Sequence, residues 1–290
     1  MKKIILFGAS GNLGKEIAKQ AIEQGHDLTV VVRNSQRAEQ LSKITTKAII
    51  ADVTSQSSLN TICKGFDAVI SALGKSVSPN DKSKPSFTDI DFTANSYILE
   101  EAVRSGVKKF VYVSAFHAEK YPQLEYFKVH HDFSEKLKQS GIDYSIIKPP
   151  ALFSAYLDVI EMAKKGWAIN IGAGDKKTNP VHEGDVAKIC LHSINQSNVV
   201  IEAGGKLIYT RKELNEIIQK EAAPNKKVKN VPASVVKFLL PVLRIFDKNM
   251  YAKVAFFLQV LQHDTIAPRV GESGFEAYIK EKVKSSSLRH

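Results

Sequence analysis

Six short apolar runs, rich in valine and isoleucine, recur through the first half of this chain and alternate with helix-like stretches. The runs occupy residues 2–7, 28–33, 47–52, 67–73, 109–114 and 144–149. Such near-continuous apolar strands are typical of a parallel sheet covered by helices on both faces. Strand–helix–strand repetition also requires right-handed crossovers. The alternation therefore predicts an α/β fold with a doubly wound parallel sheet.

The alternation loosens after the two prolines at positions 149 and 150. The remainder is patterned mainly as helix, including one that a capping box of Thr210 and Glu213 is expected to open. We therefore expect residues 1–150 to form the sheet domain. Residues 151–290 are expected to form a smaller, mainly helical C-terminal lobe packed on that domain.

The charge of the chain is concentrated near its C-terminus. The formal net charge is +11, and residues 206–290 hold 16 Lys and Arg against 8 Asp and Glu. No nucleic-acid-binding motif accompanies this excess, which argues against a nucleic-acid partner. Solvated helix faces, attraction for phosphorylated or carboxylated ligands, and contact with an acidic membrane surface are the remaining interpretations.

The most apolar stretch, residues 231–246, is interrupted by Lys237 and Pro241. It is also shorter than the roughly 20 residues that a helix needs to span a bilayer. The sequence therefore predicts no transmembrane segment. Three interpretations stay open for this stretch: core of the helical lobe, lining of an apolar pocket, or a segment that rests on a membrane surface.

The cysteines and histidines exclude a metal site and indicate the compartment. Cys63 and Cys190 lie far apart and form no pairing pattern, which fits a reducing cytoplasm. The histidines are not spaced as metal ligands, so no metal is expected. The basic and then apolar N-terminus leads directly into a glycine turn, which indicates a strand and not a signal peptide. We predict a cytoplasmic protein whose oligomeric state the sequence leaves open.

A glycine-rich turn follows the first apolar run. In "FGASGNLG", Gly8, Gly11 and Gly14 are spaced three apart between an expected strand and an expected helix. In a dinucleotide-binding turn the first glycine permits the tight bend, the second lets the backbone approach a pyrophosphate, and the third lets helix and strand pack closely. Backbone N–H groups at the start of the helix then face the anionic oxygens. The expected phosphate-binding residues are Gly8, Ser10, Gly11, Asn12, Leu13 and Gly14.

The end of the second run indicates which nucleotide is bound. An NAD site carries an acidic residue about 20 residues beyond the turn, to hold the ribose 2′-hydroxyl. This chain has Arg33 there and Arg37 one helical turn later. Guanidinium groups suit a 2′-phosphate, so NADP(H) is the expected cofactor of a Rossmann-type fold. Further contacts are expected where later runs end, at Asp52, Val53, Ala72, Leu73, Gly74 and Pro149.

Together these segments resemble the atypical short-chain dehydrogenase/reductase superfamily, in its NmrA-like and divinyl-chlorophyllide-reductase-like branches. The resemblance covers about the first 190 residues in order. It implies a Rossmann fold, NADP(H) binding and reduction of a small or lipophilic substrate. The same group includes sensors and assembly factors that bind nucleotide without turnover. The segments that carry the resemblance are "FGASGNLG", "VVVRNSQRAEQL", "ADVTSQSSL", "DAVISALG", "NSYILEEAVRSGVKKFVYVSAF", "SGIDYSIIKPP" and "NPVHEGDVA".

Catalytic members of that superfamily have a serine after the fifth strand and a Tyr-x-x-x-Lys on the next helix. Ser114 occupies the serine position. Helical periodicity places Tyr126 and His130 on one inward face, so a histidine stands where the lysine is expected. A neutral imidazole supplies little of lysine's positive charge, and Tyr126 is then expected to keep a pKa near its ordinary value. The alternative is that Tyr126 and His130 are satisfied core residues with no role in proton transfer.

These observations support two functions. The first is NADPH-dependent reduction of a small hydrophobic or conjugated substrate, such as an enone, a quinone or a carbonyl compound. The second is an NADP(H)-binding regulatory, redox-sensing or assembly protein without turnover, which the missing lysine favours. An epimerase or dehydratase that uses bound NAD is disfavoured by Arg33 and by the missing lysine.

Overall fold

The computed structural model describes residues 1–45 and 47–287, and the chain divides into two compact units. The first unit contains Met1–Lys75, Pro85–Lys148 and Glu183–Glu202. The second contains Ser76–Lys84, Pro149–His182 and the chain from Ala203 onward. Each unit thus takes segments from both sides of residue 150. Whether residues 1–150 and 151–290 behave as separate domains stays a prediction.

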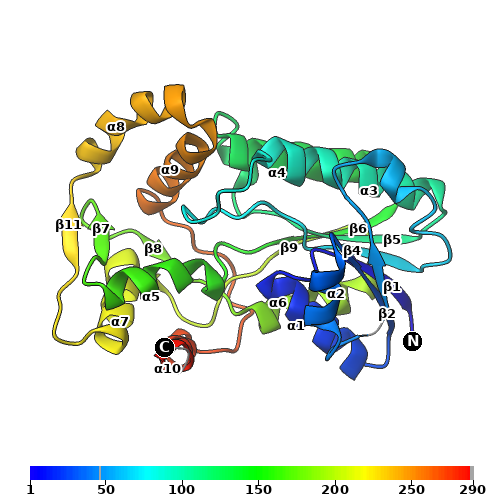
Figure 1. Cartoon of the computed structure of the whole chain (residues 1–290), viewed down its shortest axis with the longest axis horizontal. Coiled ribbons are helices and arrows are strands. Elements are labelled where there is room, and N and C mark those ends of the chain that lie inside the picture. Colours follow the sequence, from blue (N-terminus) through cyan, green and yellow to red (C-terminus); the bar gives the residue numbers. More distant parts are fainter. Residues whose placement is uncertain (46, 288–290) are drawn as a thin grey trace. The chain divides into compact units, whose positions relative to one another are not determined.

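The first unit is built on a seven-stranded parallel sheet in the order β3-β2-β1-β4-β5-β6-β9 (Figure 1). The strand order reverses between β1 and β4, as it does in a doubly wound sheet. The predicted fold class is confirmed, and each of the six apolar runs forms a strand. The strands are β1 (Lys3–Phe7), β2 (Asp27–Val32), β3 (Ala48–Ile50), β4 (Ala68–Ser71), β5 (Lys109–Val113), β6 (Asp143–Lys148) and β9 (Val199–Glu202).

Helices cover both faces of this sheet (Figure 1). One face carries α1 (Asn12–Glu23) and α6 (Glu183–His192), which pack on each other and are joined by a 2.9 Å hydrogen bond from Gln20 Nε2 to the Gly184 carbonyl. The other carries α3 (Asn95–Arg104) and α4 (Glu125–Gln139). The main core lies between the sheet and α3 and α4, and includes Ile5, Val69, Ile98, Leu99, Phe110, Tyr112, Phe133 and Leu137.

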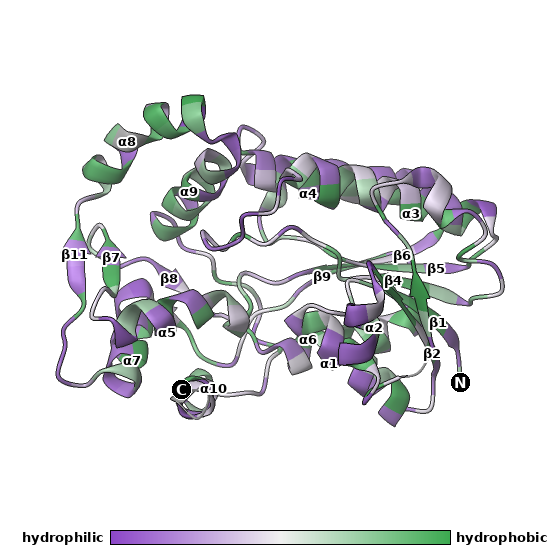
Figure 2. Cartoon of the chain, in the orientation of Figure 1, coloured by the Kyte–Doolittle hydropathy of each residue, from purple (hydrophilic) through white to green (hydrophobic). Residues whose placement is uncertain are grey.

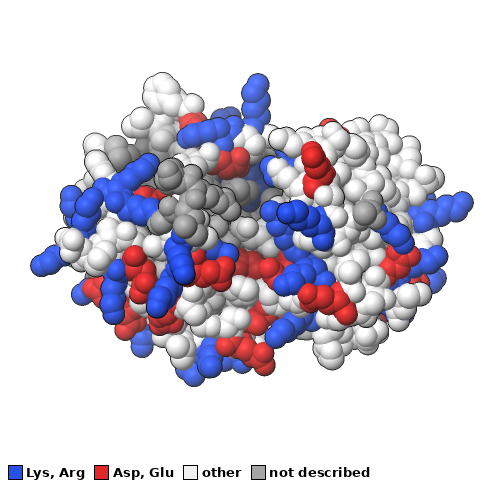
Figure 3. All heavy atoms as spheres, turned by 60° about the horizontal axis from the view of Figure 1, so that its bottom comes forward, with Lys and Arg blue, Asp and Glu red and all other residues white. Residues whose placement is uncertain are grey.

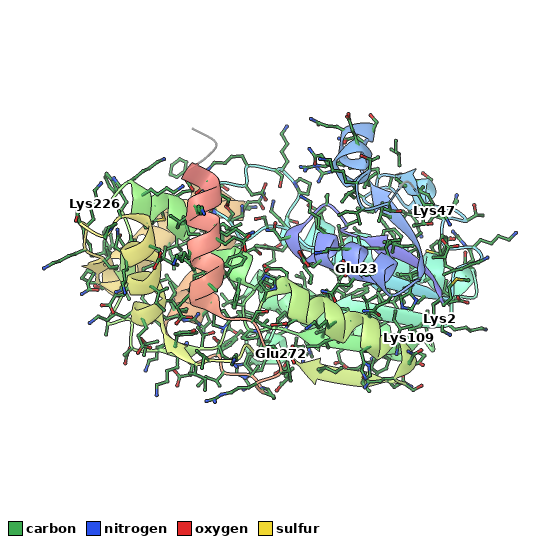
Figure 4. All side chains as sticks on the ribbon, turned by 90° about the horizontal axis from the view of Figure 1, so that it is seen from below. Lys2, Glu23, Lys47, Lys109, Lys226 and Glu272 are labelled. Carbon is green, nitrogen blue, oxygen red and sulfur yellow. The ribbon has the colours of Figure 1, made fainter. Side chains whose placement is uncertain are left out.

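Shorter elements complete the first unit. Helix α2 (Ser35–Leu41) follows β2, and a π-helical stretch, η2 (Thr88–Ala94), leads into α3. Single 3₁₀ turns occur at Gln56–Leu59, Ala118–Lys120 and Ser193–Asn195. A buried lysine joins the start of β5 to the start of β6 and to the segment before β9: Lys109 Nζ lies 3.3 Å from Asp143 Oδ1 and donates to the Tyr144 and Gln196 carbonyls (Figure 4).

The second unit is mainly helical, as predicted. The expected capping box opens α7: the Glu213 N–H donates to Thr210 Oγ1 at 3.1 Å and the Thr210 N–H donates to Glu213 Oε2 at 2.6 Å. A 3₁₀ turn at Phe153–Tyr156 precedes α5. The helices are α5 (Leu157–Lys164), α7 (Arg211–Ala222), α8 (Ala233–Phe246), α9 (Lys248–Leu261) and α10 (Phe275–Ser287). Two small sheets pair β7 (Ile169–Ile171) with β11 (Lys229–Val231) and β8 (Lys177–Thr178) with β10 (Tyr209–Thr210).

The loop after β4 belongs to the second unit because a buried lysine on α9 holds it. Lys253 is 1% exposed, and its Nζ donates to the carbonyls of Ser78 at 2.8 Å and Asp81 at 2.7 Å. Asn249 Nδ2 donates to the Lys84 carbonyl at 2.9 Å. Within the described residues, no helix combines the length and the hydropathy that crossing a membrane requires.

Gly14 offers a test of the packing of α1 on the sheet. A Cβ at this position would lie 2.1 Å from the Gly8 carbonyl oxygen, far inside contact distance. Helix propensity alone would make Gly14→Ala stabilising by up to about 1 kcal/mol. Because a backbone atom must move, we expect the free energy of unfolding to fall instead by about 2–3 kcal/mol.

The measurement is chemical denaturation followed by far-UV circular dichroism. Gly274→Ala is the control, since a Cβ there meets no atom within 4 Å and is expected to change stability by less than about 0.5 kcal/mol. A stabilised Gly14→Ala protein would contradict the close approach of α1 to the turn.

Candidate functional site

The predicted phosphate turn lies between β1 and α1, against the end of β4. Gly8 has a φ of +81°, a conformation that side chains rarely adopt. A Cβ on Gly8 would lie 2.5 Å from the Ala72 carbonyl oxygen. Only glycine therefore fits here, and it brings together two segments that the sequence predicted to share a ligand, the glycine turn and Ala72–Gly74.

The remainder of the turn is shaped to receive an anion. The Gly11 N–H donates to the Gly8 carbonyl at 3.1 Å, and Gly11 itself is exposed. Gly11 begins α1 with no side chain to cap it, and the first turn contains no acidic residue. The unpaired N–H groups and positive dipole end of a helix favour negatively charged groups. The turn therefore fits a pyrophosphate, with Ser10, Asn12 and Leu13 beside it.

The residues expected at the adenosine end gather where β2 and β3 finish. Arg33 follows β2 and is exposed, and β2 pairs with β3, which ends two residues before Asp52. Hydrogen bonds from Thr54 hold the pKa of the Asp52 carboxyl below its ordinary value, and the Arg33 charge acts in the same direction. Arg37 lies in α2, where its side chain donates to Gln40 Oε1 at 2.9 Å. Val53 packs against the core beneath these residues.

Two polar side chains of the η2–α3 segment hold the end of β4. Asn95 Oδ1 accepts a 2.6 Å hydrogen bond from Ser71 Oγ, and its Nδ2 lies 3.4 Å from the Leu73 carbonyl. Asp91 Oδ2 accepts from the Lys75 N–H at 3.1 Å. These bonds fix the backbone through Gly74, where a Cβ would lie 3.0 Å from Asp91 Oδ1.

The structure brings Tyr126 and His130 into direct contact on α4 and places Ser114 against the same helix. Ser114 follows β5, and its Oγ lies 3.2 Å from Ser134 Oγ, which donates to the His130 carbonyl at 2.7 Å. The Tyr126 ring stands edge-on to the His130 ring, with centroids 4.7 Å apart. His130 is buried and His131 is only partly so, which places the histidine of the predicted register inside.

Both ring nitrogens of His130 face protein groups. Nδ1 lies 2.7 Å from the Tyr112 hydroxyl, and Nε2 lies 3.5 Å from Asp91 Oδ1. The His130 and Asp91 side chains are 6% and 1% exposed, so little water reaches either group. The π-helical stretch contributes Asp91, strand β5 contributes Tyr112, and helix α4 contributes the half-buried Tyr126 and the buried His130. We call these four residues the Asp91 cluster.

Burial keeps the Asp91 cluster uncharged near neutral pH. It raises the pKa of Asp91 to about 8, which a hydrogen bond from the Lys75 N–H only partly offsets. It lowers the pKa of His130 to about 3. The pKa of Tyr126 is raised by burial and then by the nearby Asp91, not held near its ordinary value as the sequence suggested. A lysine would have the opposite effect on Tyr126.

Sequence reasoning missed Asp91, Asn95 and Tyr112. A signal was present, because Asp91, Asn95, Ile98 and Ala102 follow helical spacing and all are buried. A carboxyl and an amide on the apolar face of a helix indicate a polar site. Of the predicted cofactor contacts, Pro149 falls in the second unit. Among the described residues, no three His, Cys, Asp or Glu side chains gather as metal ligands.

Comparison with known proteins identifies the ligand class of this fold. The sequence model of a family described as NAD(P)H-binding matches residues 8–197, which include the glycine turn and the strands of the parallel sheet from β2 to β6. The chain belongs to the NAD(P)H-binding family. Membership confirms the predicted resemblance to NAD(P)-binding proteins. It also confirms a nicotinamide dinucleotide as the cofactor.

Similar proteins match this chain over nearly its whole length. Photosystem II assembly factor Ycf39 of Trieres chinensis is 22% identical over 98% of this chain and 89% of its own. Divinyl chlorophyllide a 8-vinyl-reductase of Arabidopsis thaliana is 28% identical over 97% of this chain and 73% of its own. The NADPH-dependent quinone oxidoreductase QOR2 of Escherichia coli, solved with NADPH, has a TM-score of 0.69 at 19% identity and covers 99% of this chain and 100% of its own.

The protonation states of the Asp91 cluster predict how stability depends on pH. A carboxyl whose pKa rises on folding costs stability as pH rises from about 4 to about 8, because the unfolded chain ionises first. A histidine whose pKa falls on folding costs stability as pH falls from about 6.5 to about 3. Between about pH 4 and 6.5 the two groups change the free energy of unfolding in opposite directions as pH rises. Above about pH 6.5 only the loss of stability due to Asp91 remains.

We therefore expect the free energy of unfolding to fall by about 2 kcal/mol between pH 6.5 and 8, and Asp91→Asn to remove this loss. Urea denaturation at a series of pH values measures it. Asp89→Asn, an exposed aspartate of the same stretch, is the control and should keep the wild-type slope. Parallel profiles for wild type and Asp91→Asn would show that Asp91 does not titrate in this range.

Proposed function

We propose that this protein is a cytoplasmic, NADPH-dependent reductase of a small hydrophobic or conjugated substrate, of the NmrA-like, atypical short-chain dehydrogenase/reductase type. The observation that carries the proposal is that Ser114 lies just beyond β5 against α4, the helix that carries Tyr126 and His130. Strand β5 pairs with β4, whose end packs on the glycine turn. Ligands of open α/β sheets bind outside the carboxyl ends of the strands, where these residues lie.

The preference for NADP(H) in this proposal depends on two arginines. Gly8, Gly11 and Gly14 would receive the pyrophosphate, and Arg33, with Arg37 in the helix that follows, would receive a ribose 2′-phosphate. No acidic residue stands at the position of Arg33 to hold a free 2′-hydroxyl. These features favour NADP(H) over NAD(H).

The Asp91 cluster favours one kind of substrate. When bound, NADPH supplies a hydride to a substrate carbon and is oxidised to NADP⁺. Ser114 and the neutral Tyr126 hydroxyl would donate hydrogen bonds to the oxygen on which negative charge develops. A raised pKa makes Tyr126 a weak proton donor, so charge delocalised by conjugation, as in an enone or a quinone, needs the least help from it. The second hydrogen arrives as a proton from Tyr126 or from water.

The similar proteins support this substrate class. One is named a vinyl reductase and another a quinone oxidoreductase. Both names describe reductions of unsaturated molecules by those proteins. A conjugated substrate for this chain agrees with them and with an uncharged site.

A specific observation also favours a second function, an NADP(H)-binding assembly or regulatory protein without turnover. Both nitrogens of His130 face protein groups, and the position carries no positive charge near neutral pH. Ycf39, a similar protein, is named an assembly factor. Binding of NADP(H) without hydride transfer would support this function over the first.

Arg33→Ala tests the cofactor preference. A charge-assisted hydrogen bond contributes about 1.5–3 kcal/mol, so we expect the Kd for NADPH to rise about 10- to 100-fold while the Kd for NADH stays nearly constant. Isothermal titration calorimetry at fixed salt measures both constants. Arg269→Ala, an exposed arginine of the second unit, is the control for charge alone. Equal losses for both cofactors would remove the role of Arg33 at the 2′-phosphate.

Tyr126→Phe tests the chemistry. With enones, quinones and aldehydes as substrates, we expect the wild type to oxidise NADPH and Tyr126→Phe to lower kcat about 10- to 100-fold with little change in KM. Absorbance at 340 nm follows the reaction. The control is Tyr144→Phe, because Tyr144 and Lys148 have the same spacing but lie on strand β6. A fully active Tyr126→Phe enzyme would contradict the assigned role, and no oxidation by the wild type would favour the second function.

A further inference from the structure

Helix α8 presents large apolar side chains to solvent over most of its length. In the described part of the second unit it contributes no buried side chain, although Figure 2 shows it mostly in the hydrophobic colour. It packs on α9, and side chains of intermediate exposure such as Leu243 lie along it. The exposed apolar side chains are Val235 (50%), Phe238 (83%), Val242 (52%), Ile245 (77%) and Phe246 (83%).

These five side chains form one continuous face. At the α-helical rotation of about 100° per residue, they fall within an arc of about 100°. Lys237 and Arg244 are exposed and lie together on a different side of the helix. The arrangement is that of an amphipathic helix whose apolar side faces outward from the protein.

The surroundings of α8 are strongly basic. Residues 222–246 contain five lysine and arginine residues and no aspartate or glutamate. Lys226, Lys227 and Lys229 are exposed in the turn and strand that lead into α8, and Figure 4 labels Lys226 at this end of the second unit. By contrast, the face shown in Figure 3 intersperses Lys and Arg with Asp and Glu. Asp247, the exposed residue directly after α8, is the first acidic residue beyond this stretch, and with Asp247 included the stretch keeps a formal charge of +4.

We propose that α8 is an interfacial helix that docks this protein on the surface of an anionic lipid bilayer. A helix with an apolar face and a basic opposite face is the arrangement that lies in the headgroup plane, with its phenylalanines in the acyl boundary. At 14 residues α8 is about 21 Å long, so it lies along the surface and does not span the bilayer. Each cation near a negatively charged leaflet adds to the attraction.

The charge argues against the other occupants of this face. In a symmetric dimer through α8, the same patch of each copy would face the other. Five cations from each chain would then approach, against the single acidic residue Asp247 at the end of α8. A lipid surface supplies both the apolar layer and the negative charge that the face lacks.

Vesicle sedimentation tests the proposal on the full chain. We expect binding to large unilamellar vesicles of equal parts phosphatidylglycerol and phosphatidylcholine, and not to phosphatidylcholine alone. Phe238→Ser with Phe246→Ser should lower the partition coefficient by about tenfold or more, because both rings leave the acyl boundary. Lys237→Gln with Arg244→Gln should also weaken binding, and added salt should do the same for the wild type.

Leu207→Ser is the matched control, since Leu207 is a 46% exposed apolar side chain of the same unit outside α8. It should bind vesicles as the wild type does. Circular dichroism checks the fold of each variant. The proposal would be overturned if the wild type did not bind anionic vesicles. It would also be overturned if the variant with Phe238→Ser and Phe246→Ser bound them as strongly as the wild type.

A reporter variant keeps the apolar face intact. Trp167 is the single tryptophan, so Phe238→Trp in a Trp167→Phe background places one fluorophore on α8. Its emission should shift to shorter wavelength with anionic vesicles and stay unchanged with phosphatidylcholine. If sedimentation velocity shows a wild-type dimer that the Phe238 and Phe246 variant loses, and no emission shift occurs with vesicles, the occupant is a second copy and the proposal fails.

Discussion

The approach of the β1–α1 turn to the end of β4 is the constraint on which the site depends. Backbone meets backbone there, since a single added carbon at Gly8 would collide with the Ala72 carbonyl, and one at Gly14 would collide with Gly8. No side chain can relax such contacts by rotating. The positions of α1, β1 and β4 are thereby fixed relative to one another. The same contacts leave the first N–H groups of α1 directed toward the carboxyl edge of the sheet.

A second constraint is the free-energy cost of burying charge between the sheet and the helices α3 and α4. Strand β5 and helices η2 and α4 enclose a carboxyl, an imidazole and phenols with little access to water. In such surroundings neutral forms are favoured over ions. The site therefore differs from one organised around a lysine in kind and not only in strength. The cluster can orient hydrogen bonds, but its neutral His130 supplies no fixed positive charge near neutral pH, and the positive charge that acts on Asp91 comes from Lys75.

The sequence predicted the features that depend on neighbouring residues, which are the strands, the glycine turn and the inward face of α4. Six strands were visible because each is apolar on both faces, and the Gly8–Gly14 turn because its steric requirements leave few alternatives. The inward placement of His130 followed from helical spacing. Its partners Tyr112 and Asp91 lie 18 and 39 residues away in the sequence and meet it only through tertiary packing. Helical spacing could have marked Asp91 as an inward residue, but no local period reveals that it contacts His130. The raised pKa of Tyr126 was missed for the same reason.

The path of the chain between the two units has a further consequence. The chain passes from one unit to the other five times, at Lys75, Lys84, Lys148, His182 and Glu202. A fragment that stops at residue 150 would lack α6, which packs on α1, and β9, which pairs along β6. It would expose an unpaired strand edge and an uncovered apolar face, both of which promote aggregation. Neither unit can therefore be produced as one continuous fragment of the chain. A single recombination between the genes of two related proteins could not exchange one whole unit for another.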